Sequence, residues 1–327
     1  MKKAVITGSG CLSSNLVAVL SAAGWETIVL HRHGSNGVRG ATSNRPVNSS
    51  SVSDLAAAIP HFVDAVFHVA ANTSFWPKHQ DRILRDNVEF TANMLTASSL
   101  RNVGRFIHTS TAAVYDPVGT MYSRSKQMAE KLVVHSGLDW VIVQPCIIVG
   151  AHDRKSYARL FRDLPRFAPP GDIEFGDARS IAEAHLKAFE VGMNGNAYLL
   201  GGWKHTWLEF FQEIASVTGQ RQPIGTLPRS AVRLLCAWEA FKSWLSGNPP
   251  LLTWPMAKLM MQDSEVPPQF WKDSLALKYH SMSLHDMVQD CWDSLNPHQE
   301  TGHEQDQEPA HQQRAEAADP SCCSQSC

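Results

Sequence analysis

The amino-acid sequence predicts an α/β fold, a doubly wound parallel sheet followed by a smaller, mostly helical C-terminal lobe. Over the first 150 residues, short apolar runs alternate with stretches in which apolar residues recur at helical spacing. Strict alternation of strands and helices is typical of a parallel sheet, and strands this apolar are expected where helices cover both faces. After Gly150 the alternation ends and the sequence becomes richer in Pro, Trp and Met. These later residues are therefore assigned to a second lobe.

Each expected element has its own local signal. Apolar runs predict strands over residues 3–7, 26–30, 65–70, 105–109 and 140–144, and amphipathic spacing predicts helices over 13–23, 54–59, 82–99 and 122–136. Residues 33–53 are polar and rich in Gly, Ser and Asn, so a connection is expected there. In the second half, helices are predicted over 181–191, 206–218 and 228–245, and a strand over 197–201 that returns to the sheet.

The pattern divides the chain into three parts. Residues 1–150, with 175–202 returning to them, form the predicted α/β domain, and residues 151–174 and 203–296 form the second lobe. Residues 297–327 have almost no large apolar side chains, which is typical of a disordered acidic tail. The helix over 228–245 is expected to line an apolar substrate pocket or the core of the lobe, with a membrane contact or a dimer face as alternatives. Its apolar stripe consists of Leu234, Leu235, Trp238, Phe241, Trp244 and Leu245.

The composition excludes several classes of protein. The formal net charge is −2; residues 297–327 contain six acids and one arginine, or −5, which leaves +3 for the rest. This balance gives no electrostatic reason to expect nucleic acid as a partner. No run of 18 apolar residues is present, and the four-residue run near the N-terminus is too short for a signal peptide, so a cytoplasmic protein without a membrane span is expected. The seven cysteines and fifteen histidines show no metal-ligand spacing, so no metal is expected.

A glycine-rich turn directly follows the first strand and leads into the first helix. It contains Thr7, Gly8, Gly10, Cys11 and Leu12. The pyrophosphate of a dinucleotide needs a turn without obstructing side chains, backbone N–H donors and the positive end of a helix. Gly8 and Gly10 provide the first two, so these five residues are predicted to bind a nicotinamide cofactor. A turn that uses glycine only for its conformation is the alternative.

The second predicted strand is followed by His31 and Arg32. An acidic residue at this point would accept hydrogen bonds from the adenosine ribose, whereas an arginine favours a 2′-phosphate. Arg32 therefore predicts NADPH as the favoured cofactor, with NADH possible. An ordinary surface arginine is the alternative.

Tyr122 and Lys126 stand four residues apart in a predicted helix and so share one of its faces. A tyrosine protonates an alkoxide at neutral pH only if its pKa, ~10 when free, is lowered, and a neighbouring ammonium does this by stabilising the phenolate. Eleven residues before Tyr122, Thr111 lies at a strand end rich in hydroxyls and is predicted to hydrogen-bond a substrate carbonyl. The spacing alone occurs by chance in many helices, but this context favours a catalytic site.

Together these motifs resemble the extended short-chain dehydrogenase/reductases, and within them the dihydroflavonol reductase-like and 3β-hydroxysteroid dehydrogenase-like branch. The resemblance extends over about residues 3–296 and implies a Rossmann-type NAD(P)-binding domain with a substrate-binding lobe. The segments on which it rests are residues 66–71, 87–89, 109–111, 122–126, 144–146, 175–179 and 182–185.

The resemblance implies a role for individual residues. Tyr122 would be the general acid/base, Lys126 would lower its pKa and hold the nicotinamide ribose, and Thr111 would hydrogen-bond the reacting oxygen. Asn87 would help to order a water of the proton relay. The residues that would border the cofactor are Ala70, Ala71 and Pro145.

Three departures from the family's pattern are expected to have consequences. The glycine turn is one residue shorter before its second glycine, which shifts the phosphate donors, and Ser13 replaces the last glycine, so that a Cβ crowds the helix–strand contact. Gln144 replaces a usual arginine, and Ser180 a usual aspartate. Only ten residues separate Thr111 from Tyr122, which leaves the rim of the site more open.

The sequence thus predicts an oxidoreductase that reduces a carbonyl, or oxidises the matching secondary alcohol, on a small to mid-sized apolar substrate. A homodimer is possible. A sugar-nucleotide epimerase or dehydratase of the same fold is disfavoured by the Trp-rich second lobe and by the lack of a basic cluster for a second pyrophosphate. A non-catalytic dinucleotide sensor or scaffold is disfavoured by the intact Tyr–Lys–Thr set. His68, inside a strand, is expected to be a hydrogen-bonded interior histidine.

Overall fold

The computed structural model describes residues 1–115, 119–154, 157–263 and 268–296. Its centre is a seven-stranded sheet in which every pair of neighbouring strands is parallel. From one edge to the other the strands are β10 (Asn196–Leu200), β6 (Trp140–Pro145), β5 (Arg105–Thr109), β4 (Ala65–His68), β1 (Lys3–Thr7), β2 (Glu26–Arg32) and β3 (Ser43–Val47). This order is that of a doubly wound Rossmann-type sheet, so the predicted fold class is confirmed.

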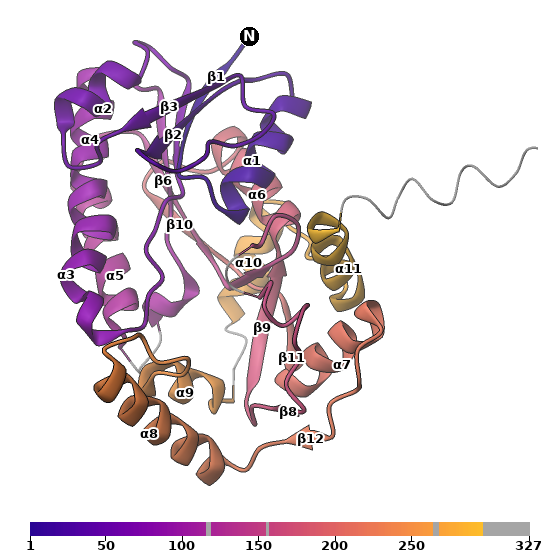
Figure 1. Ribbon diagram of the computed structural model, residues 1–327. Coiled ribbons are helices and arrows are strands. Elements are labelled where there is room, and N and C mark those ends of the chain that lie inside the picture. The colour runs from indigo at the N-terminus through magenta and orange to yellow at the C-terminus, as the bar shows by residue number, and fades with distance from the viewer. Residues whose placement is uncertain (116–118, 155–156, 264–267, 297–327) are drawn as a thin grey trace, which may run out of the picture. The chain divides into compact units, whose positions relative to one another are not determined.

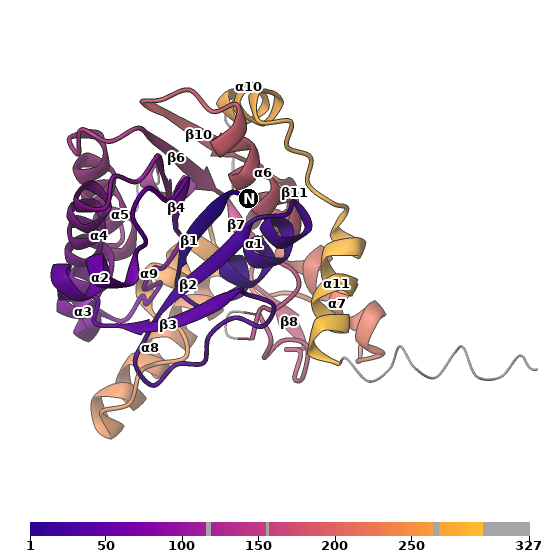
Figure 2. The ribbon, with the colours of Figure 1, turned by 90° about the horizontal axis from the view of Figure 1, so that it is seen from above.

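Helices cover both faces of this sheet (Figures 1 and 2). Side chains of a strand alternate between the two faces, so Val5 packs into one apolar core and Ile6 into the other. A strand buried on both sides must be apolar throughout, which is why the strands were visible as apolar runs. On one face lie α1 (Cys11–Ala22) and α6 (Ala178–Glu190), and on the other α2 (Val52–Ala58), α4 (Phe90–Leu100) and α5 (Met121–Val134).

Strand β3 lies within residues 33–53, where the sequence predicts a connection. It is polar and contains Pro46, because it is an edge strand whose single neighbour in the sheet is β2. Proline has no backbone N–H to give to a ladder and is tolerated at such an edge. Pairing with β3 also extends β2 two residues beyond the predicted end, to Arg32.

The helix predicted over residues 82–99 is divided into three segments. α3 (Gln80–Leu84) passes into a π-helical turn, Arg85–Glu89, which passes into α4. π turns are rare and occur frequently at functional sites. This turn contains Asn87, one of the predicted site residues.

Beyond β6 the chain forms a third apolar core with strands too short to be predicted from their pattern. The strand predicted over 197–201 does return to the sheet, as β10 beside β6. α7 begins with a capping box formed by Thr206 and Glu209 and packs against α11. The elements of this part are β7 (Ile147–Val149), β8 (Phe167–Ala168), β9 (Asp172–Asp177), β11 (Trp203–Thr206), α7 (Trp207–Thr218), β12 (Gly225–Thr226), α8 (Arg229–Ser246), α9 (Trp254–Met260), α10 (Pro268–Ala276) and α11 (Leu284–Leu295).

The apolar stripe predicted within residues 228–245 lies in α8, but it faces neither a core nor the predicted substrate pocket. Leu234, Trp238 and Trp244 are 72%, 57% and 76% exposed, while Val232 and Cys236 on the other side of the helix are buried. The expectation that this stripe lines a substrate pocket or the core of the lobe is therefore wrong, because α8 packs through its opposite face. Within the described residues, no helix has the length and apolarity needed to cross a membrane.

Candidate active site

The predicted site residues lie near the carboxyl ends of β1, β4 and β5. Thr7 ends β1, Ala70 follows β4, and Thr111 follows β5. The order of strands reverses between β1 and β4, since the chain first runs from β1 outward to β3 and then returns to β4. Ligands of doubly wound sheets bind outside the carboxyl ends of the strands at such a switch point.

The first glycine of the turn has a backbone conformation and a close neighbour that both favour glycine. Gly8 has a φ of +87°, and its backbone N–H donates to the carbonyl of Leu30 at 2.8 Å. A Cβ at position 8 would lie 3.2 Å from the Cβ of Ala70. Ala70 is fixed there because its N–H and that of Val69 both donate to Thr7 Oγ1 at 3.1 Å. The predicted small-residue floor and the glycine turn are therefore in direct contact.

The start of α1 is left open by the turn. Gly10 occupies the N-cap position, which has no side-chain hydrogen bond, and a Cβ there would meet nothing within 4 Å. Ser13, expected to crowd the helix against the strand, is buried and donates from its hydroxyl to the carbonyl of Thr7 at 3.2 Å. The side chain at position 13 is thus accommodated by a hydrogen bond that glycine could not make.

Near the second strand, Arg32 has a partner that the sequence did not indicate. The Arg32 side chain is 59% exposed, and its Nη1 lies 3.7 Å from Asp86 Oδ2. Asp86 also lies 3.6 Å from Arg82 and accepts a hydrogen bond from Asn72 Nδ2 at 2.8 Å. An arginine and a carboxylate therefore lie side by side where the adenosine ribose is expected.

Tyr122 lies in the first turn of α5, where the predicted helix begins. The N-cap residue, Thr120, accepts a hydrogen bond from the backbone N–H of Ser123 at 3.0 Å. Thr111 acts on the Tyr122 hydroxyl and lowers its pKa, and the Tyr122 ring lies 6.1 Å from that of Phe75 in an edge arrangement. The structure thus brings together the predicted acid and the predicted hydroxyl partner, and adds an aromatic ring beside them.

Lys126 follows one turn later and is almost fully buried. Its Nζ donates to the carbonyl of Thr109 at 2.6 Å and lies 3.5 Å from His108 Nε2. Burial lowers the pKa of Lys126 to about 8. Burial raises the pKa of Tyr122, and Thr111 opposes the rise. Burial and Thr111 are the causes of the shift at Tyr122, so the lowering of its pKa by Lys126 stays a prediction.

Asn87, which lies in the π turn, is hydrogen-bonded to the first part of α5. Its side-chain amide donates to Ser125 Oγ at 2.9 Å and to the carbonyl of Asn72 at 3.0 Å, and it accepts from the Asn72 N–H at 2.7 Å. Ser125 in turn donates to the carbonyl of Tyr122 at 2.7 Å. The predicted role in ordering a relay water stays a prediction. Asn72 and Ser125 were not predicted, because the contact depends on the π turn.

Buried histidines line the strands beneath the site. His68 is hydrogen-bonded through both ring nitrogens, to Thr7 and Thr91 at 3.0 Å each, as expected for an interior histidine. Burial lowers its pKa to about 3. His108 stacks on His68 with ring centroids 5.5 Å apart, and within the described residues its Nδ1 has no partner. Two neighbouring parallel strands bring these rings together, which no spacing within one strand could indicate.

The positions that depart from the family's pattern form their own contacts. Gln144 is buried, donates from Nε2 to Glu130 at 2.7 Å and accepts from the Tyr115 hydroxyl at 3.1 Å. The backbone N–H of Ser180 donates to Asp177, the N-cap residue of α6. Ala71 is exposed next to Ala70, and Pro145 is the buried last residue of β6.

The chain belongs to the NAD dependent epimerase/dehydratase family, whose model matches residues 4–201. Among curated relatives, the “Putative dihydroflavonol 4-reductase” of Synechocystis sp. is 27% identical over 265 residues, which cover 68% of this chain and 74% of that protein. The “Sterol demethylase protein B” of Methylococcus capsulatus is 27% identical over 192 residues, 51% of this chain and 58% of that protein. The resemblance seen in the sequence is thereby confirmed, and the chain is a member of an NAD-dependent enzyme family.

Solved structures share the fold. The crystal structure of gox2253 superposes with a TM-score of 0.74 at 22% identity, covering 91% of this chain and 99% of that one. The Bordetella bronchiseptica enzyme WbmH, solved in complex with NAD+, superposes with a TM-score of 0.70 at 18% identity over the same shares of the two chains. At these identities the likeness is one of fold.

Proposed function

We propose that this chain is an NAD(P)-dependent reductase or dehydrogenase that acts on a carbonyl, or the matching secondary alcohol, of a small to mid-sized apolar substrate. The observation that supports this best is the position of Thr111 beside the Tyr122 hydroxyl, whose pKa it lowers, one helical turn from the buried Lys126. Two hydroxyls that lie next to each other can both donate a hydrogen bond to the same substrate oxygen. A carbonyl oxygen that gains negative charge during reduction is stabilised by such preorganised donors.

The residues of the β1–α1 turn fit a dinucleotide. Gly8 leaves no side chain in the way, and the start of α1 has no capping side chain, so its backbone N–H groups are available for a pyrophosphate. When bound, the nicotinamide supplies hydride to the substrate carbon or accepts it. Lys126 has three N–H donors and uses one on the Thr109 carbonyl, which leaves donors for the hydroxyls of the nicotinamide ribose.

Tyr122 is in the acid form at neutral pH, because burial raises the pKa of its phenol. In the reducing direction it gives its proton to the substrate oxygen, while Thr111 hydrogen-bonds the same oxygen and holds it in place. The Lys126 ammonium, charged below about pH 8, then stabilises the phenolate from the next turn of α5. Asn87 and Ser125 keep this first part of α5 in position.

An apolar substrate is favoured by the aromatic side chains beside the acid. The Phe75 ring lies against Tyr122, and Trp76 next to it is half-buried. Rings of this kind stack on or surround apolar groups, whereas a sugar diphosphate needs charged partners. The names of the two curated relatives mention a dihydroflavonol and a sterol, which agrees with this choice.

NADPH is proposed as the favoured form of the cofactor. Arg32 ends β2 and is more than half exposed, so it can turn toward a 2′-phosphate. Asp86 beside it would repel that phosphate, and the preference therefore depends on which of the two side chains faces the ribose. The family as a whole is NAD-dependent, so NADH remains the alternative.

Substitution of Tyr122 by phenylalanine tests the proposal. We expect the variant to bind NADPH as before and to lose roughly 10²–10⁴ in kcat on a panel of apolar ketones and aldehydes, because only the transferable proton is removed. Tyr157→Phe is the matched control, since Tyr157 packs against Phe210 in the third core and should leave activity unchanged. Full activity in Tyr122→Phe, or no binding of either cofactor below millimolar, would contradict the proposal. Turnover of a sugar nucleotide instead would favour the epimerase alternative.

A further inference from the structure

α8 packs onto the molecule through a side with two apolar and two polar residues, and it presents larger apolar side chains to solvent. Its buried residues follow the helical spacing i, i+4, i+7 and i+11. Apolar residues repeat that spacing two positions later, about 200° further round the helix. The buried residues are Val232, Cys236, Glu239 and Ser243. The exposed apolar residues, which we name the outer face of α8, are 48% to 72% exposed; they are Leu234, Trp238, Phe241 and Leu245.

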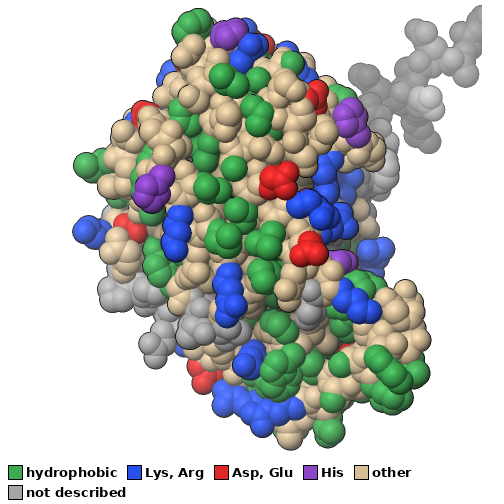
Figure 3. Space-filling model, turned by 90° about the vertical axis from the view of Figure 1, so that its left-hand side faces the viewer, with side chains coloured by type: hydrophobic (Ala, Val, Ile, Leu, Met, Phe, Trp, Pro, Cys, Tyr) green, Lys and Arg blue, Asp and Glu red, His purple; other side chains and the backbone are tan. Residues whose placement is uncertain are grey.

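The outer face is part of a continuous apolar surface. The rings of Trp238 and Phe241 lie 5.9 Å apart, and those of Phe241 and Trp244 lie 6.2 Å apart. The loop after α8 adds Leu251, which is 61% exposed and lines the same hollow as Leu245. At the lower end of the view in Figure 3, where α8 lies in Figure 1, hydrophobic side chains gather beside Lys and Arg. A contiguous patch of this kind marks an interaction site, unlike single exposed apolar residues.

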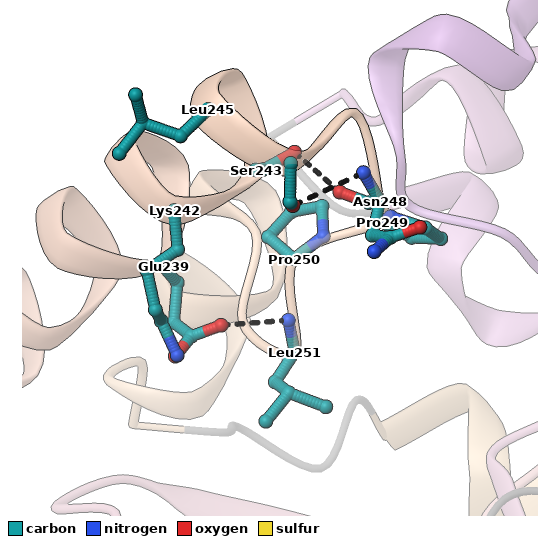
Figure 4. Close-up of a pocket in the computed structure, with 9 residues that line it drawn as sticks. Glu239, Lys242, Ser243, Leu245, Asn248, Pro249, Pro250 and Leu251 are labelled. Carbon is teal, nitrogen blue, oxygen red and sulfur yellow. Dashed lines mark hydrogen bonds and ion pairs between the residues drawn. The ribbon is translucent and has the colours of Figure 1, made fainter.

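Buried polar groups hold the turn between α8 and α9 in place (Figure 4). Glu239 Oε2 accepts from the backbone N–H of Leu251 at 3.1 Å, and Ser243 Oγ donates to the carbonyl of Asn248 at 2.7 Å. A hollow of about 430 Å³, lined in part by Leu245 and Leu251, lies at this turn and shares no residue with the candidate active site. The turn that carries Leu251 is therefore held against α8 by side chains of its buried side.

The charge around the outer face is positive. Residues 228–263 contain four bases and two acids, whereas the whole chain has a net charge of −2. Glu239 is buried and paired with Lys242, and Asp263 is 3.3 Å from Arg229. Each acid is thus paired with a base, which leaves an excess of two bases, Arg233 and Lys258. The four bases are Arg229, Arg233, Lys242 and Lys258.

We infer that the outer face of α8 docks onto the surface of an anionic lipid bilayer, with the helix lying in the plane of the interface. Trp, Phe and Leu on one side of a helix with Lys and Arg around them are the composition of interfacial amphipathic helices. Anionic headgroups complement the basic side chains. This inference does not depend on the proposed function.

Two other occupants fit the outer face less well. The segment from residue 297 on has no Leu, Ile, Val, Phe, Trp or Met and a net charge of −5, so it has nothing to bury against an apolar surface. In a two-fold dimer the same patch would meet itself, and the basic side chains of both copies would face each other. A lipid surface satisfies the apolar and the charged groups together.

Co-sedimentation of the full chain with vesicles tests the inference. We expect binding to phosphatidylcholine vesicles containing about one quarter phosphatidylserine, weaker binding to phosphatidylcholine alone, and a decrease with added salt. The double variant Trp238→Gln/Phe241→Gln should lose roughly tenfold or more in partition coefficient, since two rings no longer enter the bilayer. Trp203→Gln is the matched control, because Trp203 is a 51% exposed tryptophan on β11, outside α8.

Each alternative has a distinct result. Equal binding of the double variant, or no binding of the unchanged chain to either vesicle, overturns the inference. So does a dimer in sedimentation velocity that the double variant converts to a monomer without any vesicle binding, which would assign the face to a second copy. Unchanged circular dichroism and cofactor binding in the double variant show that the fold is intact.

Discussion

Lys126 is a positive charge that folding places almost entirely out of water, with the Thr109 carbonyl and His108 as neighbours. Desolvation disfavours the ammonium, and the pKa falls from 10.5 to about 8. The unfolded chain therefore holds this proton more tightly than the folded chain. The contribution of Lys126 to the free energy of unfolding rises as pH rises from about 8 to 10.5, and below 8 the cost of the buried charge is fully present.

The titration of Lys126 should also change the dissociation constant of the cofactor with pH. If the Lys126 ammonium binds the nicotinamide ribose, the dissociation constant of NADPH increases above pH 8, by at most about tenfold per pH unit, because one proton must be present. Isothermal titration calorimetry across this pH range measures it. In Lys126→Arg the charge persists to high pH, and the increase near pH 8 should vanish. An identical increase in that variant would assign the titration to another group.

We expect Arg32 and Asp86 together to determine which cofactor is preferred. Arg32→Ala should weaken NADPH binding by roughly 10–100-fold, the value of a charge-assisted hydrogen bond, and leave NADH binding almost unchanged. Asp86→Asn keeps the shape and removes the charge that faces Arg32 at 3.7 Å, so it should strengthen NADPH binding. Fluorescence titration of both cofactors checks these results. A loss of NADH affinity equal to that of NADPH in Arg32→Ala would show that Arg32 does not read the 2′-phosphate.

The sequence predicted some of these residues and not others for a physical reason. Tyr122 and Lys126 share a helix face, and Thr111 follows a strand end, so local spacing is enough to place them. Asp86 and His108 acquire their partners from other elements, across the sheet or across the π turn. Such neighbours depend on strand order and on one irregular turn, neither of which has a local signal.

At the scale of elements, the turn between β1 and α1 is the most constrained connection of the site. Gly8→Ala combines a positive φ with a Cβ 3.2 Å from Ala70, so it should destabilise the fold by roughly 1–3 kcal/mol and abolish cofactor binding. Gly24→Ala is the matched control: its φ is +78° with nothing within 4 Å of a Cβ. It should lose stability and keep cofactor binding. Urea denaturation and calorimetry separate the two effects, and retained affinity in Gly8→Ala would rule out this turn as the cofactor cradle.

Elements with a regular, buried pattern were predicted closely, as for β1 and β5, whose bounds agree with the expected strands. The π turn was missed because it interrupts a helix without changing its apolar spacing. α8 was predicted as a helix but assigned to the wrong surroundings. An apolar stripe indicates that burial of that helix face is favourable. It does not indicate whether the face is buried by the same chain or by another partner.

At the scale of the molecule, the described residues form four apolar cores, one on each face of the main sheet, one around α7 and α11, and a small one between α8 and α9. The doubly wound order was predictable from the alternation of strands and helices. The third core was not, because its strands are two to six residues long and polar residues interrupt them. The extent of a substrate-binding lobe accordingly stays a prediction.

The uncapped start of α1 has a consequence for the abundance of the protein. A ligand that binds only the folded chain stabilises it by mass action, by about 2.7 kcal/mol at a hundredfold excess over its dissociation constant. Differential scanning fluorimetry should therefore show a melting temperature that rises by roughly 5–10 °C with saturating NADPH and not with adenosine, which lacks the phosphates. An equal rise with adenosine would place the stabilising contact elsewhere than α1. The amount of folded protein, and not only its turnover, would then follow the supply of the dinucleotide.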